Sequence, residues 1–516
     1  MKTRLRFLLL LASPILLRTG FYTAEAQVGA LAKPLLNASS GTVAGLPTNS
    51  ISHLTVKGSD LWLGTGKGLA RTTDGGLTFS SFRNVPQFPT QSVFSLDIHG
   101  QTIWCGTGYT KDVQDASVQT GTGYAFSTDY GSTWHTAPQP LDGRGDSLVV
   151  YGINTVRFLP IVVPEQNVTF DLAVTDSAVW VASWSSGLRK STDNGQTWKR
   201  TVLPSRTRSS VSPADTLGEY VVNPLLDNNF LLFSVYPQTG NIIWAGSAGG
   251  VNKSTDGGIS WRNLTVDNLS QSFLGNWVIA IKGQALGTHT RVWITDWPAE
   301  GANEVYGISC TDDSGATWQN FLAGTKAYDF AFKDSIVYVA SDDGLFRSSD
   351  EGRSWVRSGS VVDPASGNTL TSSVFYAVGV IGDTVYGGNA DGLVRTVDNG
   401  PHPFGSQWDV LRTNVPVGSP GATYAYPNPF SPRQGPIRIH YSTGGVGASV
   451  TIELFDFGMN RVRTLLRNAQ RSGTAEHDEI WDGKNDGGSF LPNGVYFYRV
   501  TVGGNDPAWG KVMVLQ

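Results

Sequence analysis

The sequence predicts an all-β protein, because of its composition, its periodicity and one repeated motif. Of the 516 residues, 61 are glycine and 11% are aromatic, while only 16% are charged. Abundant glycine beside aromatic residues, Val and Thr is typical of twisted strands joined by tight turns. After residue 26, no long segment has the 3.6-residue apolar period of a helix. A chain of this length is expected to fold as two or three domains.

Residues 1–26 have the pattern of a signal peptide. A basic start is followed by an apolar run over residues 7–17, and Ala24-Glu25-Ala26 supplies a small-x-small cleavage site. The run is too short for a transmembrane segment, which needs about 20 residues. Removing four basic side chains and one acidic one changes the formal net charge from −4 to −7. An acidic chain without basic clusters is not expected to bind nucleic acid.

An eight-residue motif, Ser/Thr-x-Asp-x-Gly-x-Thr/Ser-Trp/Phe, is the strongest repeated feature. Six copies are nearly complete, and a seventh, which begins at Thr396, reaches its aromatic residue late, at Trp408. In a hairpin turn, the Asp and hydroxyl side chains accept hydrogen bonds from nearby backbone N–H groups, and Gly adopts a backbone conformation that other residues rarely take. The aspartates are therefore predicted to be structural and not catalytic: Asp74, Asp129, Asp193, Asp256, Asp313, Asp350 and Asp398.

Each motif follows an apolar segment with an aromatic and small residues, such as LWLGT from Leu61 or VWVAS from Val179. A further β segment precedes each of these, so that one repeat supplies four strands. Four-stranded units repeated around an axis form a β-propeller, and seven units lie within the usual range of 4–8 blades. Residues 46–412 are therefore predicted to be a seven-bladed β-propeller. Within the N-terminal segment 27–45, residues 28–43 are a candidate for a strand that completes the last blade.

The repeated motif resembles the Asp box, or BNR repeat, of sialidases, xyloglucanase-type hydrolases and related propellers. In that family the box joins the third and fourth strands of each blade, on the face away from the ligand. The resemblance implies that the ligand binds at the opposite face, which we call the insertion face. Long insertions at 108–121, 136–166, 200–230 and 296–304 are predicted to lie there, and such loops commonly carry function. The candidate ligand-face residues are Tyr109, Trp184, Tyr220, Asp296, Trp297, Glu300 and Glu304.

The sequence does not favour catalysis or metal binding. Hydrolysis of a glycoside commonly needs two carboxylates roughly 5–10 Å apart, and the loops contain enough Asp and Glu to supply them. However, the nearest match to the arginine motif of sialidases, VRFLP at 156–160, lies in the wrong place. No histidine has metal-binding spacing, and no phosphate-binding loop precedes a helix, so we expect no metal and no cofactor. The half-match to a calcium loop at 482–487 is interpreted as a glycine-rich hairpin.

Basic residues recur at the position immediately before five of the boxes and are assigned to the repeat: Arg71, Lys190, Lys253, Arg347 and Arg395.

The pattern changes after Trp408. Residues 413–422 are predicted to be a linker, and alternating strands in 423–516 predict a small β-sandwich. YPNPFSP (426–432), VTIELFDFGMNRVRTL and IWDGKNDGGSFLPNGVYFYRV form an ordered series. They resemble the Ig-like domain of flagellar hook-capping proteins and the sorting domains of type 9 secretion cargo. This resemblance implies a partner in the outer-membrane secretion machinery and a secreted or outer-surface location in a Gram-negative bacterium.

Three functions fit the sequence. The favoured one is a non-catalytic binding or scaffold protein that contacts a glycan or protein at the insertion face. It predicts an exposed aromatic cluster without paired carboxylates. The second is an extracellular glycoside hydrolase of the sialidase or xyloglucanase type, which needs two carboxylates within about 10 Å at the central opening. The third is an assembly or stability factor similar to the photosystem assembly propellers, which also use seven Asp-box blades.

Overall fold

The computed structural model describes residues 45–516, apart from 83, 114–115, 363–368, 371, 414–420, 427, 434–435, 472–475 and 516. The predicted signal peptide, the candidate closing strand at 28–43 and most of the predicted linker lie outside the described residues. The described chain forms two compact units that divide between Leu411 and Arg412. Nowhere in the described part of the chain is there a helix both long and apolar enough to cross a membrane.

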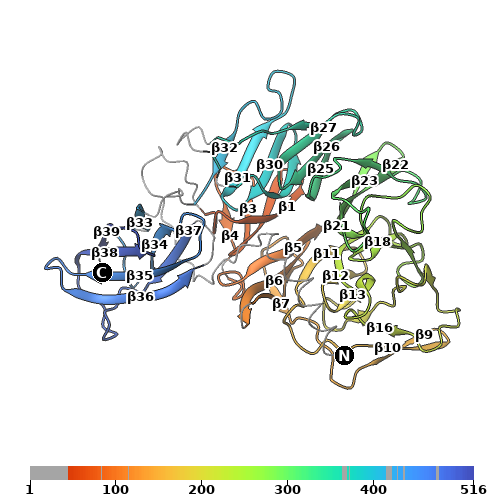
Figure 1. Cartoon of the computed structure of the whole chain (residues 1–516), viewed down its shortest axis with the longest axis horizontal. Helices are drawn as coiled ribbons and strands as arrows, with labels where there is room; N and C mark the ends of the chain where they lie inside the picture. The colour runs from red at the N-terminus through yellow and green to blue at the C-terminus, as the bar shows by residue number, and fades with distance from the viewer. Residues whose placement is uncertain are drawn as a thin grey trace. The chain divides into compact units, whose positions relative to one another are not determined.

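The first unit contains seven antiparallel sheets, each built from four strands that follow one another in the sequence, and the fourth sheet has a fifth strand at its edge (Figure 1). The first three sheets are β1 (Ile51–Lys57), β2 (Asp60–Thr65), β3 (Gly68–Thr72), β4 (Ser80–Ser81); β5 (Ser92–His99), β6 (Thr102–Val113), β7 (Ala116–Ser127), β8 (His135–Ala137); and β11 (Thr169–Val174), β12 (Val179–Ser183), β13 (Gly187–Ser191), β14 (Lys199–Arg200).

The next four sheets repeat this order. They are β17 (Leu232–Pro237), β18 (Ile243–Ser247), β19 (Gly250–Ser254), β20 (Trp261–Leu264); β21 (Trp277–Leu286), β22 (His289–Trp297), β23 (Gly307–Thr311), β24 (Gln319–Phe321); β25 (Ala327–Lys333), β26 (Ile336–Ser341), β27 (Gly344–Ser348), β28 (Val356–Arg357); and β29 (Phe375–Ile381), β30 (Thr384–Asn389), β31 (Gly392–Val397), β32 (Asp409–Leu411).

The seven sheets form a closed ring. The first strand of each sheet contacts the first strand of the next, and β29 of the last sheet contacts β1 of the first. Figure 1 shows β30 and β31 beside β1 and β3. Four-stranded sheets placed around an axis in this way make a β-propeller. The structure therefore confirms the prediction of an all-β protein that contains a β-propeller.

The sheets pack on one another through the two sequence signatures. At five of the seven junctions, the aromatic residue of a second strand lies against a glycine in the Asp box of the following sheet. A Cβ atom added to Gly258, which has φ +89°, would lie 2.3 Å from Cη2 of Trp180. Likewise, a Cβ on Gly195 would lie 2.9 Å from Cη2 of Trp104. The glycine of the box is therefore required both by its backbone conformation and by this close contact.

The same contacts close the ring between the last sheet and the first. Gly75, in the first Asp box, offers its carbonyl oxygen to two side chains of the last sheet. Tyr386 on β30 donates through its hydroxyl at 3.3 Å, and Arg395 on β31 donates through Nη1 at 2.5 Å. Leu411 on β32 lies over Gly76, where an added Cβ would be 2.6 Å from Cδ1 of the leucine. The ring is thus closed by contacts between side chains of the last sheet and the Asp box of the first sheet.

Six of the seven Asp boxes make the expected turn. In the third box, Asp193 accepts hydrogen bonds from the Ser191 hydroxyl at 2.8 Å and from the Thr197 backbone N–H at 2.9 Å. The N–H of Gly195 donates to the Ser191 hydroxyl at 2.9 Å. The seventh box differs, because Asp398 is 5% exposed and turns to the sixth sheet. There it accepts hydrogen bonds from Nε of Arg347 and the hydroxyl of Tyr338.

The two longest insertions fold against the outer side of the third and fourth sheets. They begin and end at the insertion face, as predicted, but between these points they form a separate sheet of β9 (Leu148–Tyr151), β10 (Asn154–Phe158) and β16 (Val221–Val222). They also supply β15 (Ser210–Val211), which pairs with β20 at the edge of the fourth sheet, and the short 3-10 helix η1 (Asn228–Phe230). Much of their length therefore stabilises the propeller and does not form its face.

The second unit is a β-sandwich. One sheet contains β33 (Thr423–Tyr426), β34 (Ile437–Ser442) and β37 (Glu476–Trp481). The other contains β36 (Arg461–Arg471), β35 (Ala448–Phe455), β38 (Gly494–Val502) and β39 (Ala508–Val514). Ile439 and Trp481 of the first sheet pack with Ile452 and Val500 of the second in one buried core. The assignment of this sandwich as an Ig-like sorting domain stays a prediction. In the half-match to a calcium loop, the Lys484 ammonium lies 3.1 Å from the Asp482 carboxylate.

Candidate ligand site in the central channel

A cavity of about 600 Å³ lies at the centre of the propeller, and all seven first strands line it. Each first strand is antiparallel to the second strand of its sheet, so it begins at the end where the second strand turns into the third. The Asp boxes lie at the opposite end. The starts of the first strands therefore lie at the insertion face, and the channel runs from there toward the Asp-box face.

A β-bulge near the start of every first strand shapes the mouth of this channel. A bulge leaves one residue out of the ladder and bends the strand. The register shifts between Val93 and Ser95, and the residue left out, Phe94, lines the channel. A register shift occurs in all seven first strands, and in five of them the residue left out is an aromatic one that lines the channel: Phe94, Phe170, Phe233, Tyr328 and Tyr376.

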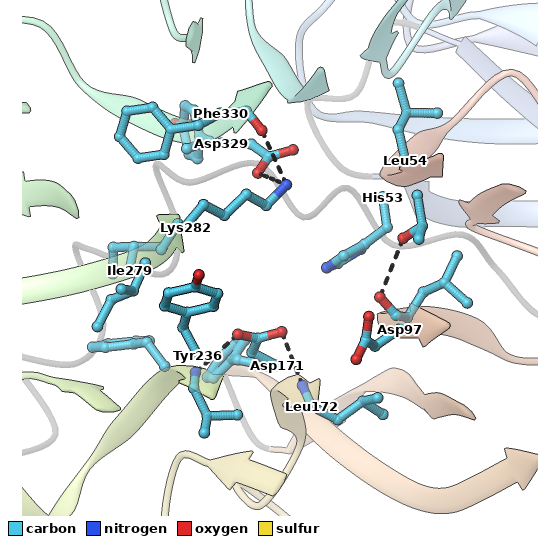
Figure 2. A pocket seen from close by; sticks show the side chains of 18 of the residues that line it. His53, Leu54, Asp97, Asp171, Leu172, Tyr236, Ile279, Lys282, Asp329 and Phe330 are labelled. Carbon is cyan, nitrogen blue, oxygen red and sulfur yellow. Dashed lines mark hydrogen bonds and ion pairs between the residues drawn. The ribbon is translucent and has the colours of Figure 1, made fainter. Parts of the chain in front are cut away.

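A polar layer lies among the apolar wall residues of the channel (Figure 2). It combines three carboxylates, one lysine, one histidine and one tyrosine from six different first strands: Asp97, Asp171, Asp329, Lys282, His53 and Tyr236. All six side chains are only partly exposed. Since the first strands of neighbouring sheets are not joined by a ladder, polar side chains are the groups available to bridge them.

The three carboxylates bridge neighbouring sheets. Each accepts a hydrogen bond from a backbone N–H of the following first strand. Asp97 accepts from Val174 at 2.7 Å, Asp171 from Val235 at 2.9 Å, and Asp329 from Val378 at 3.2 Å. Asp329 also forms an ion pair with Lys282, whose Nζ lies 2.6 Å from Oδ1 and donates to the Phe330 carbonyl at 3.1 Å.

Burial changes the protonation of this layer. Burial raises the pKa of Asp171 to about 7, and the negative charge of Asp97 adds to the rise. Burial also raises the pKa of Asp97. The pKa of His53 is lowered by burial to about 4, although the carboxylate of Asp329 opposes this shift, so the imidazole is neutral at pH 7. Burial disfavours the charged form in each case.

Two of the predicted ligand-face residues, Trp184 and Trp297, line the channel. Trp184 packs on Phe233, with 5.2 Å between ring centroids. Trp297 donates from Nε1 to the Ala327 carbonyl at 2.8 Å, and Nζ of Lys326 lies 4.1 Å from its ring centroid. Burial lowers the pKa of Lys326 to about 8.

The predicted acidic residues do not line the channel. Glu304 accepts four hydrogen bonds within and beside its own loop, from Ala299 N, Gly301 N and both nitrogens of Asn276. Glu300 joins two loops by an ion pair with Arg206 at 3.0 Å. Asp296 is completely buried and accepts from the Ser309 hydroxyl at 2.5 Å, and burial raises its pKa to about 8.

The two predicted tyrosines also lie away from the channel lining. Tyr109 lies on β6, in the long hairpin where it pairs with Thr120. Tyr220 packs against the apolar core of the third and fourth sheets and donates its hydroxyl to the Leu203 carbonyl at 2.8 Å. Hence two of the predicted site residues, Trp184 and Trp297, line the channel, and the other five lie outside its lining.

The polar residues of the channel were missed by the sequence analysis. One signal was present: Phe170-Asp171-Leu172 and Tyr328-Asp329-Phe330 share the pattern aromatic-Asp-apolar at the same place in two repeats. Aligning the repeats on their second-strand segments, VWVAS from Val179 and VYVAS from Val337, brings these triplets into register. Asp97 and Lys282 carry no such signal. Each pairs with the aromatic residue of its second strand, and the other repeats have unrelated residues at the equivalent position.

The basic residues before the Asp boxes act within the repeat. Nζ of Lys190 lies 4.7 Å from the ring centroid of Trp180 and donates to the Gly257 carbonyl of the next box. Lys253 makes the equivalent contacts with Trp244 and with the Ser314 carbonyl at 2.7 Å. These cations join one sheet to the next, and they form no converging cluster for an anionic substrate.

No family model and no curated protein matches the sequence. Among solved structures, the GH74 enzyme of Niastella koreensis matches with a TM-score of 0.51 and 14% identity, over 93% of this chain and 75% of that one. YCF48 from Cyanidioschyzon merolae matches with a TM-score of 0.40 and 17% identity, over 68% and 96% of the two chains. PorZ, a surface component of the type-IX secretion system of Porphyromonas gingivalis, matches with a TM-score of 0.33 and 14% identity, over 90% and 75%. What the chain shares with the GH74 enzyme is the β-propeller fold.

Proposed function

We propose that this protein is a secreted or cell-surface binding protein. Its seven-bladed Asp-box propeller takes a glycan or protein ligand through the insertion face. The Ig-like C-terminal domain directs its export across the outer membrane. The observation that carries the binding function is the central channel, whose mouth is walled by aromatic side chains.

The size and wall of the channel support this proposal. Ligand sites commonly occupy 300–1,000 Å³ and combine an apolar wall with a few polar groups, and this cavity measures about 600 Å³. Trp277 and Tyr328 are partly exposed within it. Trp184 and Phe233 pack around Trp277, with ring centroids 6.1 and 5.7 Å away. Rings held in place in this way lose little conformational entropy when a sugar ring or an apolar side chain stacks on them.

Removal of the aromatic wall tests the binding function. The mature chain would be screened on a glycan array and a peptide panel, and each ligand found would be titrated against Trp277→Ala and Tyr328→Ala. We expect each variant to weaken binding about tenfold or more, since aromatic anchors dominate such sites. Phe457→Ala is the matched control, because Phe457 is 80% exposed on the sandwich. Binding that neither channel variant changes would refute the channel as the site.

A glycoside hydrolase is the second candidate function. Asp171 favours it, because burial raises its pKa to about 7 and it faces the same channel as Asp97. A general acid of this kind is needed for glycoside hydrolysis. However, both carboxylates already accept backbone N–H groups that join neighbouring sheets. Release of reducing sugar from a polysaccharide, lost in Asp171→Asn, would establish the hydrolase and overturn our first choice.

The proposed export function rests on the motifs of the C-terminal domain. YPNPFSP and the strands that follow it resemble sorting domains, and the sandwich has its own buried core. Deleting residues 423–516 should leave the propeller in the periplasm of a host that has the secretion system. The matched control replaces the domain with an unrelated β-sandwich of similar size. Normal secretion of the truncated chain would refute the sorting function.

A further inference from the structure

We infer that the channel binds a primary alkylammonium group, as carried by a lysine side chain or a free polyamine. The ammonium lies among Asp97, Asp171 and His53, and the alkyl chain runs along Trp277 and Tyr328 toward the insertion face. This inference specifies the ligand of the proposed binding function and rests on it.

The charges in the channel wall are unbalanced. Asp329 is neutralised by Lys282, whose Nζ lies 2.6 Å from its Oδ1. Asp97 and Asp171 have no cationic partner among the described residues, and the hydrogen bonds they accept come from backbone N–H groups. Two carboxylates close enough to affect each other's protonation are costly to hold inside a protein without a counter-charge. A bound cation would supply that charge.

His53 supplies an acceptor for the same cation. Its Nδ1 atom is buried and has no hydrogen-bond partner among the described residues, so Nε2 is the ring nitrogen that can accept from a ligand in the channel. The imidazole points into the open space that Asp97 and Asp171 also face (Figure 2). A neutral imidazole offers one nitrogen as acceptor, and a primary ammonium has three N–H donors. Two carboxylates and one imidazole thus match the donors of the ammonium.

The protein's own lysines already occupy both kinds of environment. Lys282 places its ammonium on a channel carboxylate and on the Phe330 carbonyl. Lys326 places its ammonium against three rings, 4.1 Å from the centroid of Trp297, 5.7 Å from Tyr306 and 5.8 Å from Tyr328. Ammonium groups are attracted to aromatic faces, and methylene chains pack along them. An alkylammonium ligand would repeat these contacts at the carboxylates that remain unpaired.

The polar layer disfavours other charged groups. An anion would face Asp97 and Asp171, and Lys282, the one cation of this layer, is already paired with Asp329. A trimethylammonium group is attracted to the rings but has no N–H to donate to the carboxylates or to His53. The predicted order of affinity is therefore primary ammonium first, trimethylammonium second, and the neutral hydroxyl analogue last.

The test is titration calorimetry on the mature full-length chain. The ligands are 1,5-diaminopentane, for a polyamine source, and Nα-acetyl-lysine N-methylamide, for a protein source. Their analogues are 1,5-pentanediol, the ε-trimethyl form of the lysine ligand, and Nα-acetyl-norleucine N-methylamide. We expect the amines to bind and the neutral analogues to bind at least about tenfold more weakly. The stronger of the two amines identifies the source.

The variants Asp97→Asn and Asp171→Asn keep an acceptor oxygen for the bridging N–H groups but remove the charge. Each should weaken amine binding about tenfold or more, with no fall in the melting temperature. Glu219→Gln is the matched control, since this exposed glutamate is not a lining residue of the channel. Equal affinity for the diamine and the diol, or unchanged binding by both Asn variants, would overturn the inference.

The proposed function and this inference fail in different ways. If neutral glycans or lysine-free peptides bind, and Trp277→Ala abolishes that binding while the amines do not bind, the inference is wrong and the binding function stands. If neither channel variant changes the binding of any ligand, the proposed function is wrong as well. If the amines bind and the Asn variants weaken that binding, the proposed function and the inference are both supported.

Discussion

Trp180 of the third sheet lies directly on Gly258 of the next sheet, so close that a Cβ on the glycine would be 2.3 Å from Cη2 of the indole. The tryptophan belongs to the apolar signature of one repeat and the glycine to the Asp box of the next. The box therefore has two structural roles. It forms a turn, and its glycine provides the packing site for the tryptophan of the preceding sheet, which we call the socket. Substitutions in it should affect the contact between sheets as well as the turn.

The first prediction concerns this socket. Gly258→Ala should lower the free energy of unfolding of the propeller by about 2 kcal/mol or more, because it adds a clash to the strain of a positive φ. Gly287→Ala is the matched control, since Gly287 has φ +60° but nothing within 4 Å of an added Cβ. It should cost about 1 kcal/mol, from backbone strain alone. Urea unfolding followed by tryptophan fluorescence measures both, and equal losses would contradict the socket.

The seventh box should respond to substitution more strongly than the others. Asp398 is 5% exposed and is the partner of Arg347 and Tyr338. Asp398→Ala leaves a half-buried guanidinium without its carboxylate, which typically costs about 3 kcal/mol or more. Asp193→Ala, in an exposed box, removes turn hydrogen bonds only and should cost less. Thermal unfolding measures the loss of stability in each variant. A larger loss for Asp193→Ala than for Asp398→Ala would contradict the ion-pairing role of Asp398 in the last box.

Acid should weaken the Asp-box turns. Hydrogen bonds from the box hydroxyls and N–H groups lower the pKa of Asp193 and Asp350 to about 2. Because their folded-state pKa values are lower than the unfolded value, their contribution is complete above about pH 4 and is lost as the pH falls toward 2. The urea midpoint should therefore fall across this range. Replacing both residues with Asn should reduce that fall, and an identical pH profile would contradict this assignment.

Amine binding in the channel should become stronger as the pH rises through 7. Burial and the charge of Asp97 raise the pKa of Asp171 to about 7, so an incoming ammonium must displace a proton below that pH. Lys282, the third channel carboxylate Asp329, neutral His53 and Tyr236 are the other titratable groups of this layer. Calorimetry at pH 6.5 in buffers of different ionisation enthalpy should show proton release. Asp171→Asn should abolish this proton release. If the release persists in the variant, the proton comes from another group.

The repeats could be predicted from the sequence because their chemistry is local. An Asp box is formed by residues four apart, so Asp193 and Thr197 specify their own contact. The seventh copy departs from the motif after Gly400, but the partner that Asp398 takes instead, Arg347, lies in another sheet, and no local pattern identifies it. Trp184 and Trp297 were found because both lie where a second strand ends at the insertion face: Trp297 is the last residue of β22, and Trp184 follows β12 directly.

The channel could not be predicted in the same way. Whether Glu304 faces a ligand or bonds to its own loop depends on backbone N–H groups whose directions the sequence does not give. Asp97 and Asp171 meet only because a closed ring brings the first strands together. The insertions were expected at the insertion face, but the pairing of β15 with β20 holds part of them at the outer edge of a sheet.

The last sheet takes all four of its strands from residues 375–411, and it meets the first sheet through side chains around Gly75. Within the described residues, no strand is shared across this seam. The junction between β29 and β1 is therefore like the other six, apart from the lack of a covalent link. Four strands of each sheet come from one repeat, so new chain ends could be placed between two sheets wherever the connection supplies no strand of its own. A chain pulled from its C-terminal end would open first at this seam, and the ring would unwind one sheet at a time.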